Sequence, residues 1–304
     1  MTLERGDISA ISVKKIRLFW VLAEQELFSN YSERAQKDRI DVKAYSVVLL
    51  QLFNETNILY QSKHFLVVNK PPDILINSND CTKSTVQTML RNQFPDLSNP
   101  KLTHEFYFAH RLDFSTSGIL CIPLHKQACA SLSKSFENHK CKKYYIAIVN
   151  GHVAERQDKS LDINLAIGED IRFESTSKKM CTEFESEFCK NPRKSQTHLR
   201  VLALGNYKNR KISKVLLQPI TGRRHQLRLH CSAIGHPILG DFTYGSQEDR
   251  KMHRMYLHAI RIIAPNEYED LHIHTDDPFI DPDFCFEAVQ HSSVLNEKNF
   301  DDML

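Results

Sequence analysis

The sequence predicts an α+β protein built on a mixed, mostly antiparallel sheet. From Ile58 onward, apolar runs of strand length are separated by turns, which is typical of sheets. Only a few helical patterns are interposed between these runs, which favours the α+β class. The 304 residues are 41% hydrophobic and 25% charged, an ordinary globular composition that excludes collagen-like and low-complexity chains.

Patterning divides the chain into three predicted parts. Residues 1–56 show helical spacing of apolar residues and no functional motif, so we expect a helical N-terminal extension. Residues 57–282 carry the strand patterns and every motif described below, and we expect them to form the main domain. Residues 283–304 are acidic and lack periodicity, which predicts a disordered tail.

The first half of the main domain is expected to contain four strands and two helices. Apolar residues at i, i+4 and i+8, namely Ala128, Leu132 and Phe136, indicate one of these helices. Pro71 and Pro95 mark places where elements end, because proline lacks a backbone donor. The expected strands cover 65–69, 105–110, 118–122 and 144–149, and the expected helices cover 84–93 and 125–139.

The second half begins with a polar segment, 154–197, in which we expect hairpins and loops. A helix is predicted from Thr221, a residue type suited to the N-cap, to Ala233. Gly235 then stands where a helix C-terminus favours glycine. The remaining strands are expected over 198–204, 214–217, 255–263 and 271–274.

The net charge of +3 is unevenly distributed. Residues 57–264 carry a net charge of +13, whereas residues 265–304 carry −10. A basic core favours a polyanionic ligand, most often nucleic acid, although a solvated surface with an acidic terminus is the alternative. The chain contains no run of 18 apolar residues, so no membrane span is predicted. The eight cysteines include no C-x-x-C pair and no signal sequence opens the chain, so we expect the cytoplasm, with nucleus or mitochondrion left open.

The first chemically informative segment is HRLDFSTSG at 110–118. It places Asp113 on a loop between two predicted strands, from which its carboxylate can reach a cleft, and Arg111 points roughly the same way. The alternative is a polar turn capped by the aspartate.

The second informative segment is LQPITGRRHQLRLH at 217–230. Arg224 and Arg228 are four residues apart and are expected to share a helix face, with His225 beside them. Together with Arg223, they suit phosphate or carboxylate binding at a helix start, and a solvated basic helix is the alternative.

The two segments together resemble the RluA-type family of RNA pseudouridine synthases, and among these the RNA pseudouridylate synthase domain-containing proteins of animals. HRLD-x-x-TSG matches 110–118, and L-x-P-x-TGR-x-HQ-[LI]-R-x-H matches 217–230. Three further motifs match at 143–147, 236–245 and 257–259. One departure is Asp73, where the family usually has glycine after Lys-Pro-x.

The resemblance implies the pseudouridine synthase catalytic fold over 57–282, with a sheet in two halves flanked by helices and a central active-site cleft. It implies isomerisation of uridine to pseudouridine in structured RNA, with tRNA expected first and rRNA or mRNA as alternatives. No cofactor, metal, membrane or obligate protein partner is implied. A catalytically silent RNA-binding or chaperone module on the same fold is the alternative. A glycoside hydrolase is a weaker one, since it needs a second acid such as Glu105 or Asp241.

The resemblance also implies residue roles. Asp113 corresponds to the catalytic carboxylate, Arg228 to its partner, and Tyr145 to a tyrosine that stacks on the uracil. Arg111 corresponds to the residue that takes the space left by the target base. The other residues expected to bind RNA are His110, Lys143, Arg223, Arg224, His225 and Gln226.

Overall fold

The structure is a computed structural model that describes residues 57–154, 160–174, 179–280, 283–288 and 300. All of them belong to one compact unit, Phe53–Leu304. The predicted N-terminal extension at 1–56 lies outside the described residues. In the described part of the chain, no helix is long and apolar enough to cross a membrane.

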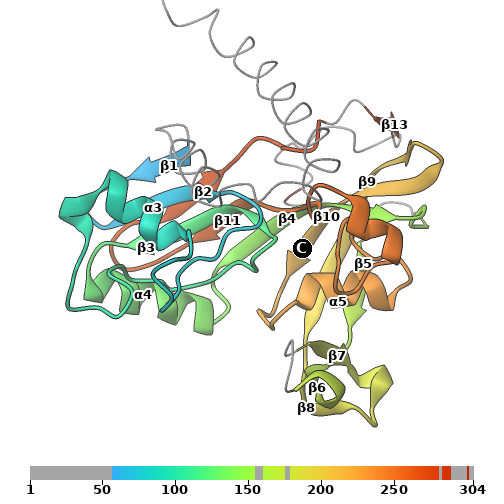
Figure 1. Ribbon diagram of the computed structural model, residues 1–304, viewed down its shortest axis with the longest axis horizontal. Coiled ribbons are helices and arrows are strands. Elements are labelled where there is room, and N and C mark those ends of the chain that lie inside the picture. Colours follow the sequence, from blue (N-terminus) through green and yellow to red (C-terminus); the bar gives the residue numbers. More distant parts are fainter. Residues whose placement is uncertain (1–56, 155–159, 175–178, 281–282, 289–299, 301–304) are drawn as a thin grey trace, which may run out of the picture. The chain divides into compact units, whose positions relative to one another are not determined.

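A ten-stranded sheet forms the body of this unit (Figure 1). Its strands run in the order β1-β2-β3-β11-β4-β10-β9-β13, with β12 added to β11 and β5 added to β9. The pairing of β3 with β11 is parallel, and the other described pairings are antiparallel, so the predicted mixed, mostly antiparallel sheet is confirmed. The strands are β1 (Ile58–Gln61), β2 (Phe65–Lys70), β3 (Ser117–Pro123), β4 (Lys142–Asn150), β5 (Leu161–Asn164), β9 (Gln196–Tyr207), β10 (Arg210–Pro219), β11 (Leu257–Ala264), β12 (Leu271–His274) and β13 (Phe284–Ala288).

A small three-stranded sheet and three helices complete the described fold. The small sheet, in the order β7-β6-β8, fills most of the segment expected to form hairpins and loops (Figure 1). Its strands are β6 (Ile167–Asp170), β7 (Met180–Thr182) and β8 (Cys189–Arg193), and the helices are α3 (Val86–Gln93), α4 (Lys126–Glu137) and α5 (Gln226–Ala233). Short 3-10 helices cover Pro95–Leu97, Ile171–Phe173, Glu183–Glu185 and Gln247–Lys251.

The central strand β4 is buried on both faces, and the alternation of its side chains organises the core. Tyr144, Ile146 and Ile148 belong to a cluster on one face. On the other face, Ala147 and Val149 pack in a cluster that includes Leu227 of α5. Successive strand residues point to opposite faces, so Tyr145 lies on the same face as Ala147.

Helix α4 packs over the other half of that face. Its residues Ala128 and Leu132 share a cluster with Cys141, which precedes β4, and with Ile119 of β3. The odd-numbered face of β4 therefore meets the α4 cluster at its beginning and the α5 cluster toward its end. Lys143 and Tyr145 lie between the two helices, which matches the expectation of two halves flanked by helices.

The helix starts are set by local hydrogen bonds. Thr85 and Thr88 form a capping box at α3, and His125 Nδ1 accepts from Ala128 N at 3.2 Å at α4. The prediction that Thr221 caps α5 is wrong, because α5 begins five residues later, after His225. The Thr221 hydroxyl instead donates to Gln226 Oε1 at 2.7 Å.

Two further expectations differ from the structure. Residues 105–110 form bends and irregular backbone rather than a strand, and Glu105, at the start of this segment, adopts a left-handed φ of 60° that an extended strand does not have. The predicted tail at 283–304 is not disordered throughout, since β13 pairs with β9 over Phe284–Ala288. Phe284 and Phe286 pack against the cluster around Tyr144, a burial that the acidic composition conceals.

We expect Gly118→Ala to destabilise the fold far more than Gly235→Ala. Both glycines have positive φ, 112° and 82°, so both substitutions strain the backbone. A Cβ at Gly118 would also lie 2.3 Å from the carbonyl oxygen of Ala259 on the parallel neighbour β11, whereas Gly235 has no such neighbour within 4 Å. Urea unfolding should show a loss of about 1–2 kcal/mol for Gly235→Ala and more than about 4 kcal/mol for Gly118→Ala. Equal losses would show that the close approach of β3 and β11 is not needed.

Candidate active site

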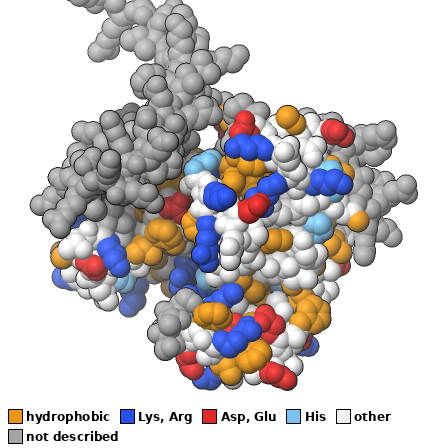
Figure 2. Space-filling view, turned by 45° about the vertical axis from the view of Figure 1, so that its right-hand side comes forward, with side chains coloured by type: hydrophobic (Ala, Val, Ile, Leu, Met, Phe, Trp, Pro, Cys, Tyr) orange, Lys and Arg blue, Asp and Glu red, His pale blue; other side chains and the backbone are white. Residues whose placement is uncertain are grey.

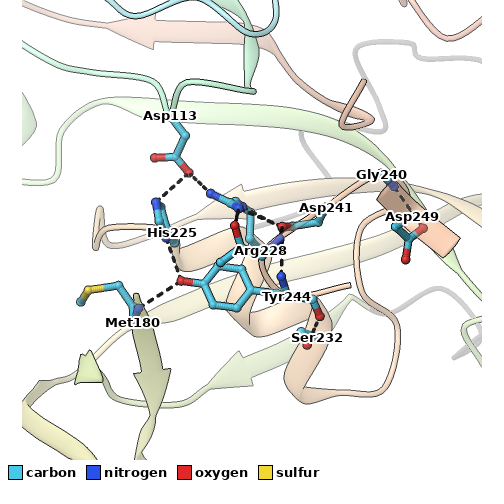
Figure 3. A network of polar contacts seen from close by, with 10 residues as sticks. Asp113, Met180, His225, Arg228, Ser232, Gly240, Asp241, Tyr244 and Asp249 are labelled. Atoms are coloured by element: carbon cyan, nitrogen blue, oxygen red, sulfur yellow. Dashed lines mark hydrogen bonds and ion pairs between the residues drawn. The ribbon is translucent and has the colours of Figure 1, made fainter. Parts of the chain in front are cut away.

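Asp113 lies in the loop that leads into β3. A backbone hydrogen bond from Thr116 N to Asp113 O, at 3.2 Å, closes a turn here. The Asp113 side chain is 20% exposed, and its Oδ2 lies 3.4 Å from Arg228 Nη1 of α5 (Figure 3). The structure therefore brings together two residues that are 115 positions apart in the chain.

Arg228 is shared between two carboxylates. Its Nε and Nη2 donate to the buried Asp241 at 2.7 and 2.8 Å, and Nη2 also donates to Thr243 Oγ1 at 2.9 Å. Burial opposes the charge of Arg228, but the bonds and charge of Asp241 outweigh it and raise the pKa of this guanidinium. Asp241 thereby fixes the orientation of Arg228 and leaves Nη1 directed toward Asp113.

His225 and Tyr244 extend this network. His225 Nε2 lies 4.0 Å from Asp113 Oδ2, and His225 Nδ1 lies 2.7 Å from the Tyr244 hydroxyl. That hydroxyl also accepts from Met180 N, so β7 of the small sheet is connected to the site (Figure 3). The guanidinium of Arg228 lies over the Tyr244 ring at 5.0 Å, a cation–π contact.

Register places Tyr145 beside the Asp113 loop. Ala259 of β11 is the partner of Tyr145 on one side and of Gly118, at the start of β3, on the other. Burial, followed by the negative charge of Asp113, raises the pKa of Tyr145, so its hydroxyl keeps its proton at neutral pH. The tyrosine can therefore stack and donate a proton or hydrogen bond, but it is not ionised at rest.

Lys143 lies on the same face of β4 as Tyr145. Its Nζ donates to Thr221 O at 3.5 Å, and burial lowers its pKa. Lys143 therefore connects β4 to the segment that precedes α5.

Two residues expected to bind RNA are occupied within the protein. His110 Nε2 accepts from Cys121 N at 2.8 Å, and its ring stacks on Phe136 at 4.8 Å. Gln226 is buried, and its amide group bonds with Gln196 O and Thr197 Oγ1 on one side and with Arg223 N on the other. Both side chains thus hold the site loops in place, and direct RNA contact by either of them stays a prediction.

The predicted arginines have different surroundings. Arg111 and Arg224 are exposed, and Arg223 Nε donates to Lys194 O at 3.3 Å. Arg224 precedes α5, so the prediction that it shares a helix face with Arg228 is wrong. Figure 2 shows Lys and Arg side chains gathered over the central part of the face that it draws.

Lys70 and the loop after it were not singled out as part of the site. Lys70 is fully buried, and its Nζ donates to the carbonyl oxygens of Pro71, Ile74 and Phe114 at 2.8–2.9 Å. Burial lowers its pKa to about 7. Because Phe114 follows Asp113, this lysine holds the loop of the site acid against β2.

Asp73, the departure from the family pattern, adopts a left-handed φ of 56°. This is the conformation that glycine provides without strain, and aspartate is one of the few other residues that tolerates it. The departure therefore keeps the backbone conformation and changes the side chain.

Three further residues of the site are not predicted from the sequence, namely Asp241, Thr243 and Tyr244. From the sequence, Asp241 is a candidate only for the second acid of a hydrolase. In the structure it instead accepts hydrogen bonds from Arg228. All three residues lie in the motif at 236–245, which was the available signal.

The mixed sheet and the pairing of Asp113 with Arg228 agree with the class that the motifs resemble, the pseudouridine synthases, which are isomerases that act on RNA. Residues 64–233 match the family described as RNA pseudouridylate synthase. The chain belongs to this family.

Several known proteins are similar to the chain. RNA pseudouridylate synthase domain-containing protein 1 of Danio rerio is 45% identical over 74% of this chain and 75% of its own length. Dual-specificity RNA pseudouridine synthase RluA of Escherichia coli is 36% identical over 66% of this chain and 83% of its own. The solved structure of human RNA Pseudouridylate Synthase Domain Containing 1 covers 81% of this chain and 94% of its own, with 38% identity and a TM-score of 0.69.

We expect the free energy of unfolding to decrease as the pH falls from about 6.5 to about 4. Burial is the main cause that lowers the pKa of His110 and His225 to about 4 and of His258 to about 3. His258 is buried between Ser117 Oγ and Thr275 Oγ1. These groups stay neutral when folded but bind protons near pH 6.5 when unfolded, so acid favours the unfolded chain.

The loss is expected to approach roughly 1.4 kcal/mol per pH unit for each such histidine inside this window. Urea denaturation at several pH values measures it. Stability that stays constant or rises on acidification through this window would contradict the neutral state of these histidines.

Proposed function

We propose that the chain converts uridine to pseudouridine in structured RNA, with tRNA as its main substrate and Asp113 as the catalytic carboxylate. The observation that supports this role is the position of Asp113, which faces Arg228 at 3.4 Å and lies in a loop beside Tyr145. The net charge of +13 over residues 57–264 supports a polyanionic substrate.

The reaction breaks the N1–C1′ bond, turns the base, and joins C5 to C1′. Asp113 serves it by attacking C1′ or by assisting departure of the base, both of which need a carboxylate close to the sugar. Arg228 holds the charged carboxylate in place, and Asp241 holds Arg228. Once C5 has joined C1′, C5 loses a proton and N1 gains one. The Asp113 carboxylate can accept the C5 proton, and the protonated Tyr145 hydroxyl can donate a proton to the base.

Extrusion of the target base precedes this chemistry. Uridine must leave its stack before a carboxylate can reach C1′, at a cost of a few kcal/mol. The Tyr145 ring can stack on the uracil, and the exposed Arg111 can stack on the bases left behind.

Release of tritium from RNA labelled at C5 of uridine tests the proposal, because C5 loses its hydrogen when pseudouridine forms. We expect the full-length chain to release tritium from tRNA transcripts in proportion to the pseudouridine formed. Transcripts of rRNA segments serve as the comparison for substrate class. Tight binding of tRNA and rRNA without any release would favour the silent RNA-binding module instead.

A further inference from the structure

Two half-exposed phenylalanines adjoin residues of the site in the chain. Phe114 is 50% exposed and Phe242 is 52% exposed. Each directly follows one of the two aspartates that contact Arg228, namely Asp113 and Asp241. Single exposed apolar residues are common on protein surfaces, so the exposure by itself means little, but their shared position at one arginine calls for an explanation.

Buried polar groups hold the backbone around both rings. The carbonyl oxygen of Phe114 accepts from the buried Lys70 Nζ at 2.9 Å. On the other side, the residue after Phe242 is fixed twice, since Thr243 N donates to Asp241 Oδ1 at 2.9 Å and Thr243 Oγ1 accepts from Arg228. Each ring is therefore displayed from a fixed backbone while its surface remains open to solvent. Fixed display of an aromatic ring lowers the entropy lost when a ligand packs on it.

We propose that Phe114 and Phe242 form a stacking pair for the bases next to the target uridine, one ring on each side of the nucleotide at Asp113. This inference rests on the proposed function. Extrusion of the uridine leaves its two neighbours without a stacking partner on one face. An aromatic side chain replaces such a partner with little regard to base identity.

The position of the rings selects this ligand. Consecutive Cα atoms are about 3.8 Å apart, so Phe114 starts within one residue of the carboxylate that must reach C1′. The nucleotides that adjoin the bound uridine must therefore pass over this border of the site. The exposed Arg224 supplies positive charge for their phosphates.

A double-mutant cycle between protein and RNA tests the pair. Wild type, Phe114→Ala and Phe242→Ala are each combined with a tRNA transcript that carries either the normal nucleotide or an abasic one directly 5′ or 3′ of the mapped uridine. We expect each alanine variant to weaken binding of the normal RNA by roughly 5- to 150-fold. Each ring is expected to stack on one of the two neighbouring bases. When that base is missing, the RNA should bind the wild type and the alanine variant equally, because the contact that the variant removes is already absent.

Two comparisons separate stacking from general destabilisation. Phe184→Ala removes a 72% exposed ring on the small-sheet segment, and its effect is expected to add to that of either abasic site. Phe114→Tyr should retain binding, whereas Phe114→Leu should lose it, because leucine is apolar but has no ring.

Additive effects of Phe114→Ala and Phe242→Ala with both abasic sites would overturn the inference. Equal binding by Phe114→Leu and wild type would also overturn it. Binding is also measured in the Asp113→Asn background, so the coupling between each phenylalanine and its base can be measured without isomerisation. A failure of isomerisation alone would count against the proposed function and not against the stacking pair.

Discussion

Replacing Asp113 with asparagine is expected to lower the rate of pseudouridine formation by at least about three orders of magnitude. Asparagine has nearly the same volume but lacks the negative charge that Arg228 and His225 face at 3.4 and 4.0 Å. It can neither attack C1′ effectively nor offset positive charge on the sugar. Single-turnover tritium release at saturating RNA measures the chemical step without the contribution of product release.

The matched control for this change is Glu105→Gln. Glu105 is the other acid considered from the sequence, but its carboxylate bonds with Gln87 and Arg91, outside the network around Asp113. We expect Glu105→Gln to leave the rate within about threefold of wild type, and Asp113→Asn to keep its affinity for RNA. A rate for Asp113→Asn above one tenth of wild type would remove Asp113 from the mechanism.

Replacing Arg228 with methionine is expected to reduce both stability and activity. The guanidinium is the bidentate partner of Asp241, a carboxylate with no exposed surface, so its removal leaves a buried charge without its main counterion. Removing one partner of a buried ion pair costs about 3–5 kcal/mol. For a domain of this size the thermal midpoint should fall by roughly 6–20 °C. Asp113 loses its arginine as well, so the rate should fall with the stability.

Arg224→Met provides the control, since Arg224 is an exposed arginine in the same segment. Its substitution should change the free energy of unfolding by no more than about 0.5 kcal/mol. Adding Asp241→Asn to Arg228→Met should restore part of the lost stability, because the unpaired buried charge is gone, but it should not restore activity. Equal stability of Arg228→Met and Arg224→Met would show that the Asp241 pair contributes nothing to the fold.

Local patterns predicted most of the elements well. The strands at 65–70, 117–123 and 271–274 and the helix α4 have apolar spacing that reports their own burial, so one segment at a time suffices to find them. The errors lie where a local bond overrides the pattern. Thr221 has the chemistry of an N-cap, but its hydroxyl donates to Gln226 Oε1 and α5 starts later, after His225.

The same distinction holds for the site. The motifs identified Asp113, Tyr145 and Arg228, and the structure places Arg228 against Asp113. His110 and Gln226 belong to the same motifs, but their polar atoms satisfy backbone and side-chain partners inside the protein. A motif reports that a residue type is needed at a position, but it does not report which partner the side chain will meet.

The sequence by itself determined the family, the α+β class, and the presence of one acid and one arginine able to act together. Only the tertiary structure decided that Asp241 shares Arg228 with Asp113, that Lys70 anchors the loop of Asp113, and that β7 reaches the site through Tyr244. The physical reason is that these contacts join residues from separate elements. Their distances depend on strand order and register, which arise from the packing of the whole domain rather than from the spacing of residues along the chain.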